Sequence, residues 1–152
     1  MNNLANSVFR QRVTGDFTGT TDELLQWAAC KWGFAPDVVR AEAAVATRWH
    51  QTPNGLLRLE LPRWQSAWPA ARDSTAFGLD VALSWQRSCY EGYLDALGVT
   101  TTLLTPTSYV PGDLMGCVGN LVSGGWYDPA AIDFESRVDQ DAQLKSWDAP
   151  GF

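Results

Sequence analysis

Hydrophobic positions recur at intervals of three and four residues through most of this chain, the spacing of helices with one buried face. The longest such stripe starts at Phe77 and steps by four through Val81, Trp85, Cys89, Tyr93 and Leu97. Cap-forming residues 73–75 precede it, and Gly98 follows it. The pattern therefore predicts a long helix over this region, with its apolar stripe packed in a core.

Two further helices are predicted before this one. The first begins at a capping box, Thr20–Glu23, in which a threonine is followed three residues later by a glutamate, and it ends at Gly33. The second starts at Pro36, a residue suited to a first helical turn, and its apolar stripe runs to Trp49. The Thr-Pro-Asn-Gly sequence at 52–55 is expected to break it.

The last third of the chain predicts two more helices. Asp113 is expected to open the fourth, and Gly124 to end it. Asp128 and Pro129 form a cap followed by proline at the first helical position, so a fifth helix is expected from there to about Trp147.

The remaining segments complete a predicted mainly α fold. The sequence LLRLEL alternates weakly and predicts a short extended segment near residues 55–61. Residues 1–19 are polar and are expected to form an extended arm before a domain spanning 20–152. We therefore predict a mainly α single domain of about five helices.

Composition and charge narrow the function classes. A chain of 152 residues with 45% hydrophobic residues is expected to fold as one domain with a real core. Its net charge of −6 argues against nucleic-acid binding, which depends on lysine and arginine neutralising phosphates. It has neither a polybasic patch nor an apolar run of roughly 20 residues, so no membrane association is expected.

The residues that usually carry chemistry are few. His50 is the one histidine, and the three cysteines show no Cys-x-x-Cys spacing, so neither a metal site nor a cofactor is predicted. Eight tryptophans are many for this length. They are expected to pack in the core, and the alternative is that a few line a groove for a ring-shaped ligand such as a sugar or a base.

Four blocks of the sequence, in this order, resemble a secreted bacterial family similar to the soluble lytic transglycosylases and goose-type lysozymes. The blocks are FTGTTDELLQWAACKWGF, VVRAEAAVATRWHQ, STAFGLDVALSWQRSCYEGYL and YVPGDLMGCVGNLVSGGWYDP. The resemblance covers about residues 14–147 and implies a lysozyme-like fold. It also implies cleavage of peptidoglycan by a glutamic acid that an apolar groove keeps protonated.

The chain departs from that family where the chemistry resides. At the family's Glu-Ser pair it has Ala46 and Thr47, and at the Gly-Leu-Met-Gln turn it has Gly55-Leu56-Leu57-Arg58. The connection between these points, residues 50–54, is also much shorter. Together the departures indicate a chain that kept the scaffold and lost the acid.

By the resemblance, the substrate-binding candidates are Thr47, Trp49, Gly55, Leu56, Arg58 and Tyr109. Trp49 is in line with the core stripe, which favours packing over a groove position. Arg58 is either a ligand contact or a solvated side chain, and the second is favoured. Tyr109 either borders the groove or packs with its hydroxyl on backbone.

Two other carboxylates are weak candidates for the missing acid. Glu42 lies one turn before Ala46, and its side chain is expected to point toward the helix N-terminus. The favoured reading is a surface charge or an ion pair with Arg40 or Arg72. Glu60 follows the Gly55 turn, and a solvated residue is again the favoured reading.

The resemblance also bears on the cysteines. Cys89 and Cys117 fall in two of the matching blocks, so a disulfide between their helices is expected in an oxidising compartment. Cys30 is then the best candidate for a buried free thiol. All three pairings stay open at this point.

These observations support three hypotheses. The first is a lysozyme-like pseudoenzyme that binds a glycan strand, such as peptidoglycan, or a protein partner. The second is an active peptidoglycan-cleaving enzyme, and the third a structural or virion protein that uses the fold as a scaffold. The resemblance implies an extracellular or cell-wall location, but the start MNNLANSVFRQRV lacks the apolar run of a signal peptide and fits the virion alternative better.

Overall fold

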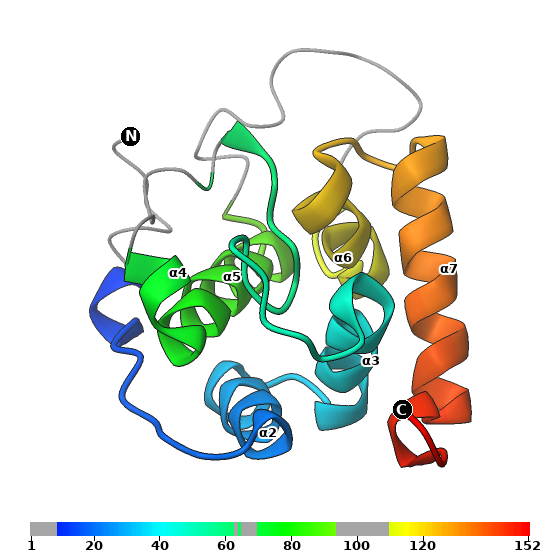
Figure 1. Ribbon diagram of the computed structural model, residues 1–152. Helices are drawn as coiled ribbons and strands as arrows, with labels where there is room; N and C mark the ends of the chain where they lie inside the picture. Colours follow the sequence, from blue (N-terminus) through cyan, green and yellow to red (C-terminus); the bar gives the residue numbers. More distant parts are fainter. Residues whose placement is uncertain (1–8, 63, 65–69, 94–109) are drawn as a thin grey trace.

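The structure is a computed structural model that describes residues 9–62, 64, 70–93 and 110–152. These residues form six α-helices and no strand, which confirms the predicted mainly α domain. The helices are α2 (Thr21–Trp32), α3 (Pro36–Thr47), α4 (Ala70–Asp73), α5 (Thr75–Tyr90), α6 (Leu114–Ser123) and α7 (Pro129–Leu144) (Figure 1). Short 3₁₀ turns lie at Arg10–Arg12 and Ser146–Asp148.

The helix starts follow the predicted caps. Thr20 and Glu23 form the full capping box of α2, because each side chain accepts a hydrogen bond from the other residue's backbone N–H. Asp113 caps α6, and Asp128 caps α7 ahead of Pro129. Each of these caps satisfies backbone donors that would otherwise lack partners.

Three helices end earlier than the apolar stripes suggested. The backbone of Arg48 turns left-handed at φ 50°, so α3 stops at Thr47 rather than Trp49. Lys145 does the same at φ 52°, so α7 stops at Leu144 and a separate 3₁₀ turn carries Trp147. The third predicted helix is α5, which ends at Tyr90, while residues 94–109 lie outside the described part.

The segment near residues 55–61 is a series of turns, not the extended segment that the weak alternation predicted. Leu56, Leu57 and Leu59 are all buried, whereas Arg58 between them is exposed with φ 53°. Burying three leucines removes far more apolar surface from water than an alternating strand edge would. Core packing therefore overrides the local pattern.

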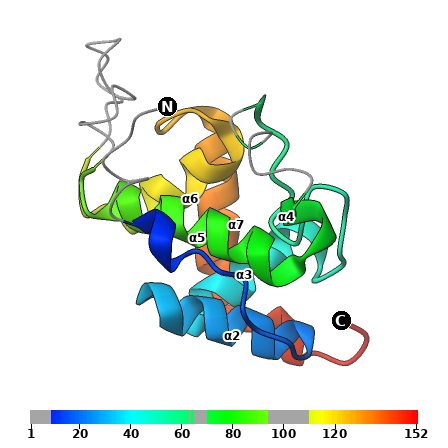
Figure 2. The same cartoon turned by 90° about the vertical axis from the view of Figure 1, so that its left-hand side faces the viewer.

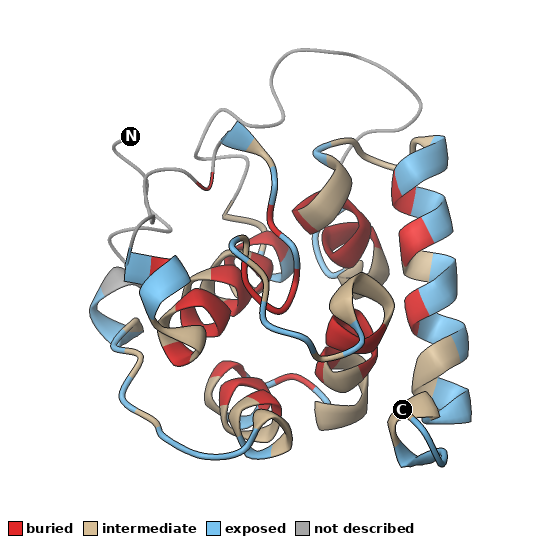
Figure 3. Cartoon of the chain, viewed as in Figure 1, coloured by how far each residue is buried: buried red, intermediate tan, exposed pale blue. Residues whose placement is uncertain are grey.

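Among the described residues the buried hydrophobic side chains form one large cluster, a smaller one between α3, α6 and α7, and a third at Cys89 and Cys117. α2 packs on both α3 and α5, and α5 packs on α6. α7 lies against α3 and α6 (Figures 1 and 2). The buried positions face inward on every long helix (Figure 3). Within the described residues, every helix is too short or too polar to cross a bilayer.

The segment before α2 is anchored, where the sequence predicted an extended arm. Phe9 is buried among the core aromatics, and the backbone N–H groups of Thr14 and Gly15 both donate to Asp80 on α5. Asp80 also accepts bonds from Lys31 Nζ at 2.6 Å and Trp32 Nε1 at 2.6 Å. This fully buried carboxylate joins α2, α5 and the N-terminal segment.

A disulfide links Cys89 on α5 to Cys117 on α6, with a Cα–Cα distance of 5.9 Å. This is the pair that the resemblance implied. Cys30 is the free cysteine, but it is exposed, so the expectation of a buried thiol is wrong. The buried face of α2 is occupied by Leu25, Ala28, Ala29 and Trp32, which turns position 30 outward.

Candidate functional site

Ala46 occupies the last turn of α3, where the resemblance places the catalytic acid. Its methyl group is half-buried and packs against a cluster shared by α3, α6 and α7, formed by Ala41, Val118, Phe134 and Val138. A methyl group in these apolar surroundings offers neither a proton nor a hydrogen bond.

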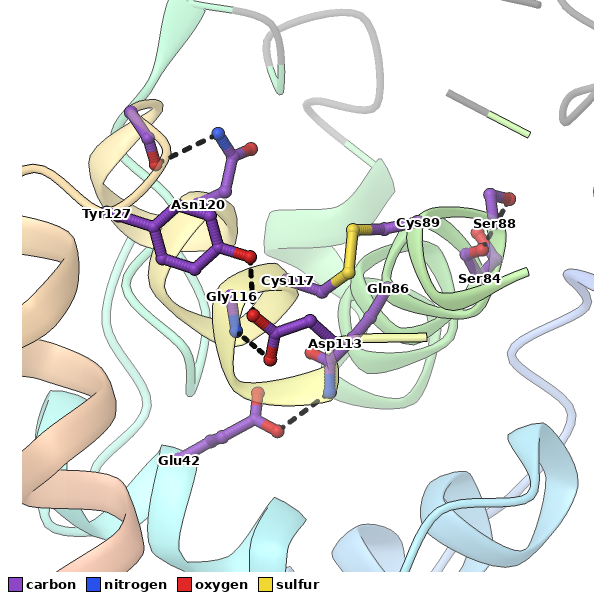
Figure 4. The surroundings of a disulfide bond; sticks show 11 residues. Glu42, Ser84, Gln86, Ser88, Cys89, Asp113, Gly116, Cys117, Asn120 and Tyr127 are labelled. Atoms are coloured by element: carbon purple, nitrogen blue, oxygen red, sulfur yellow. Dashed lines mark hydrogen bonds between the residues drawn. A yellow bond between two sulfur atoms is a disulfide. The ribbon is translucent and has the colours of Figure 1, made fainter. Parts of the chain in front are cut away.

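Glu42, one turn earlier, is fully buried, which makes the predicted surface charge wrong. Its Oε1 accepts a hydrogen bond of 3.0 Å from Nε2 of Gln86 on α5 (Figure 4). The predicted ion pair is also absent, since Arg40 binds Asp22 and Asp37 while Arg72 lies 3.8 Å from Asp73. Glu42 lies on the same helical stripe as Val38, Val45 and Trp49, and this spacing is the local indication that its side chain faces the core.

Burial governs the protonation of Glu42. Removal from water raises its pKa to about 8, and the bond from Gln86 offsets that only in part. Within the described residues, Glu42 Oε2 and Gln86 Oε1 have no hydrogen-bond partner. A neutral carboxyl donates one proton and the amide oxygen accepts one, so the protonated form suits this pair. With no exposed surface, however, Glu42 has no access to a ligand in solution.

Glu60, unlike Glu42, is exposed to solvent. Its carboxylate is 59% exposed and pairs with Arg58 at 3.0 Å, and Arg58 is 61% exposed. The predicted solvated readings of both residues are therefore confirmed. Neither side chain has the apolar enclosure that a glycosidase acid requires.

The other substrate-binding candidates near the Gly55 turn have structural roles. Thr47 Oγ1 donates to the carbonyl oxygens of Leu56, at 2.7 Å, and Ala43. Gly55 has φ 79°, a left-handed backbone that glycine adopts without strain, and it is buried together with Leu56. The turn is thus tied to the end of α3. Tyr109 lies outside the described residues.

Trp49 packs against the core, the role that its position on the stripe favoured, and being half-buried it also lines a surface cleft. Its ring stacks on Trp147 with centroids 6.1 Å apart, and it meets Phe152 edge-on at 5.2 Å. Nε1 of Trp49 donates to the carbonyl oxygen of Arg40 at 3.0 Å. Arg48 and Trp49 are both left-handed, a conformation that costs about 1–3 kcal/mol for a residue other than glycine.

The Trp49 cleft is an open cavity of about 260 Å³ between α2, α3 and the segment after α7. It is lined by Asp22, Asp37, Arg40, Trp49, Lys145, Trp147 and Asp148. Asp37 and Arg40 lie one helical turn apart, and Lys145, Trp147 and Asp148 lie within four residues of one another. Tertiary packing brings these two groups together with Asp22 and Trp49, and no local pattern predicts that grouping.

Ion pairs hold the charged groups of the Trp49 cleft in place. Arg40 Nε contacts Asp22 Oδ1 at 2.7 Å, and Arg40 Nη1 contacts Asp37 Oδ1 at 3.0 Å. Lys145 Nζ lies 3.1 Å from Asp37 Oδ2. Hydrogen bonds from Arg40 to Asp22 and from Lys145 to Asp37 lower the pKa of both carboxyl groups, so both are ionised near neutral pH.

A larger concavity of about 660 Å³ lies on the other side of the C-terminal segment, between α3 and α7. Its lining includes the apolar residues Val45, Leu144 and Phe152 and the cations Arg48 and Arg137. We refer to it as the α3–α7 concavity.

A third region gathers carboxyl groups where α6 meets α7. Asp113 accepts hydrogen bonds from Gly116 N–H and from the Tyr127 hydroxyl (Figure 4). Partial burial and the nearby charge of Asp113 raise the pKa of Glu135, whose Oε2 is buried. The sequence alone does not identify Glu135 as a candidate, because nothing local to α7 signals its proximity to Asp113.

Among the described residues, no group of histidine, cysteine or carboxylate side chains is arranged to hold a metal ion. Comparison of the chain with protein-family models, curated proteins and solved structures finds no match.

Proposed function

We propose that this chain is a lysozyme-like domain that has lost its catalytic acid and binds a glycan strand without cleaving it. The observation that carries the proposal is Ala46, an apolar residue in apolar packing at the position where the resemblance expects a glutamic acid. A missing general acid typically lowers the rate of that step by roughly 10²–10⁴-fold.

Neither of the substitute acids weighed from the sequence fits the role. Glu42 has a raised pKa, as an acid catalyst needs, but it has no exposed surface. Glu60 is accessible but lies in water beside Arg58. A glycosidase acid must combine access with apolar enclosure, and these two residues each supply only one of the two.

Solubilisation of purified bacterial cell walls tests the loss of activity. The unmodified chain is expected to release no muropeptides detectable by mass spectrometry, although it sediments with the insoluble walls. Ala46→Glu is expected to gain activity, because it restores a carboxyl group in apolar surroundings. Ala46→Gln, of the same shape but without the acid, is the matched control and is expected to stay inactive.

Release of muropeptides by the unmodified chain would contradict the proposal. Glu135 would then be the first residue to change, because it is half-buried and its pKa is raised. A Glu135→Gln variant that loses this activity would establish the active-enzyme alternative. A chain that neither sediments with walls nor cleaves them would also overturn the proposal and turn the search to protein partners.

A further inference from the structure

We propose that the Trp49 cleft is a glycan-binding site of this chain and holds one uncharged sugar unit. The inference rests on the proposed function, that the chain binds a glycan. It places one sugar unit beside Trp49 and Trp147, at the ends of α3 and α7, as a binding site in addition to the position of Ala46.

The aromatic residues supply the first half of the recognition. Trp49 and Trp147 both line the cleft, and their stacked rings are held by the edge of Phe152. Indole rings offer a large, rigid apolar surface at a small cost in conformational entropy, and the C–H faces of a sugar ring pack against such a surface. The left-handed turn at Arg48 and Trp49 keeps this tryptophan at the cleft instead of letting α3 continue.

The charged residues supply the second half. Arg40 is fixed by Asp22 and Asp37, so the carboxylate oxygens are preorganised acceptors for sugar hydroxyl groups. A lysine ammonium carries three N–H donors, and Lys145 is half exposed with one contact to Asp37, so further donors remain for sugar oxygens. Fixed donors and acceptors beside an apolar surface are the usual makeup of a small-molecule site.

The charge balance and the size favour an uncharged ring over other ligands. Three carboxylates and two cations line the cleft, which leaves one net negative charge and disfavours phosphates and other anions. A cavity of about 260 Å³ is slightly smaller than typical drug-sized sites of roughly 300–1,000 Å³. It therefore suits one sugar unit, with the rest of a strand extending into solvent.

The experiment measures binding of the uncharged trimer of N-acetylglucosamine by calorimetry and by shifts of the indole N–H signals in NMR spectra. Sedimentation with insoluble cell walls is measured in parallel. The test variant is Lys145→Gln with Asp148→Asn, which removes two exposed charges and keeps similar shapes. The matched control is Arg137→Gln, an exposed charge at the α3–α7 concavity. Circular dichroism checks that each variant is folded.

We expect the unmodified chain to bind the trimer with a shift of the Trp147 indole signal. The double variant should bind it at least about tenfold more weakly, as is usual when hydrogen bonds to charged groups are lost. Arg137→Gln should bind like the unmodified chain. Wall binding that survives unchanged in the double variant would overturn this site and leave the proposed function intact.

Two other outcomes also decide the question. Equal weakening by Arg137→Gln would overturn the Trp49 cleft in favour of the α3–α7 concavity. If the unmodified chain binds neither the trimer nor the walls, both the site and the proposed function are refuted.

Discussion

Gln86 and Glu42 meet in the interior, where the amide Nε2 donates to the carboxyl Oε1 at 3.0 Å and neither side chain is exposed. The bond connects α5 to α3 across the core (Figure 4). The bond holds the carboxyl group of Glu42 where its negative charge is poorly solvated, so the stability of the fold depends on whether Glu42 is protonated.

Stability should fall as the pH rises, through the contribution of Glu42. Its pKa is about 8 in the folded chain and about 4.5 when solvated, so the folded state holds the proton more tightly. The stabilising contribution of Glu42 is fully present below pH 4.5 and is lost as the pH rises toward 8. Above pH 8 it no longer changes with pH. The slope is at most about 1.4 kcal/mol per pH unit.

Urea unfolding at several pH values checks this prediction in the unmodified chain and in Glu42→Gln. Between pH 4.5 and 8, the free energy of unfolding of Glu42→Gln should no longer show the decrease that Glu42 causes in the unmodified chain. Glu60→Gln, which changes an exposed carboxylate, should keep it. The prediction is wrong if Glu42→Gln and the unmodified chain show parallel curves.

Asp80→Ala should destabilise the fold severely. The buried carboxylate accepts bonds from Lys31, Trp32 and two backbone N–H groups, and its loss leaves those donors unpaired. Breaking a buried ion pair from one side typically costs about 3–5 kcal/mol. Urea unfolding measures the loss, with the 71% exposed Asp73 changed to alanine as the control. A loss below about 1 kcal/mol would show that Asp80 does not join these segments in solution.

Removal of the Cys89–Cys117 disulfide should lower the free energy of unfolding by about 3–4 kcal/mol. The bond joins residues 28 apart and restricts the unfolded chain over that distance. The measurement is thermal unfolding of a double alanine variant against the unmodified chain. Cys30→Ser should leave the stability unchanged, because that thiol is exposed and unpaired. Iodoacetamide should modify the native protein at this one residue, and resistance to modification would contradict its exposure.

Gly119→Ala should force α6 away from α7. A Cβ atom there would lie 2.9 Å from the carbonyl oxygen of Ala131 and 3.0 Å from its Cβ, closer than side chains normally approach. Overpacking of this kind costs typically about 1–3 kcal/mol. The control variant is Ser123→Ala, at the end of α6. Equal melting temperatures for the two variants would show that the helices are not in close contact at Gly119.

The amino-acid sequence by itself determined the starts of the main helices. The sequence predicts Thr20 with Glu23, Asp113 and Asp128 as caps, and the structure has them there, because a cap bonds to backbone only two or three residues away. Local chemistry of this kind needs no knowledge of the rest of the fold. The Cys89–Cys117 disulfide is not local in this sense, and its expectation rests on the resemblance of two sequence blocks.

The tertiary structure alone decided which polar residues are buried and which lie together. Glu42 lies on the helical stripe of Val38 and Val45, but neither Glu42 nor Asp80 indicates locally which partner it meets. Those partners, Gln86 and Trp32, lie 44 and 48 residues away. Trp49 and Trp147 stack although they lie 98 residues apart in the sequence. Burial and charge pairing depend on the side chains that other elements bring near, and a single helix's periodicity does not contain that information.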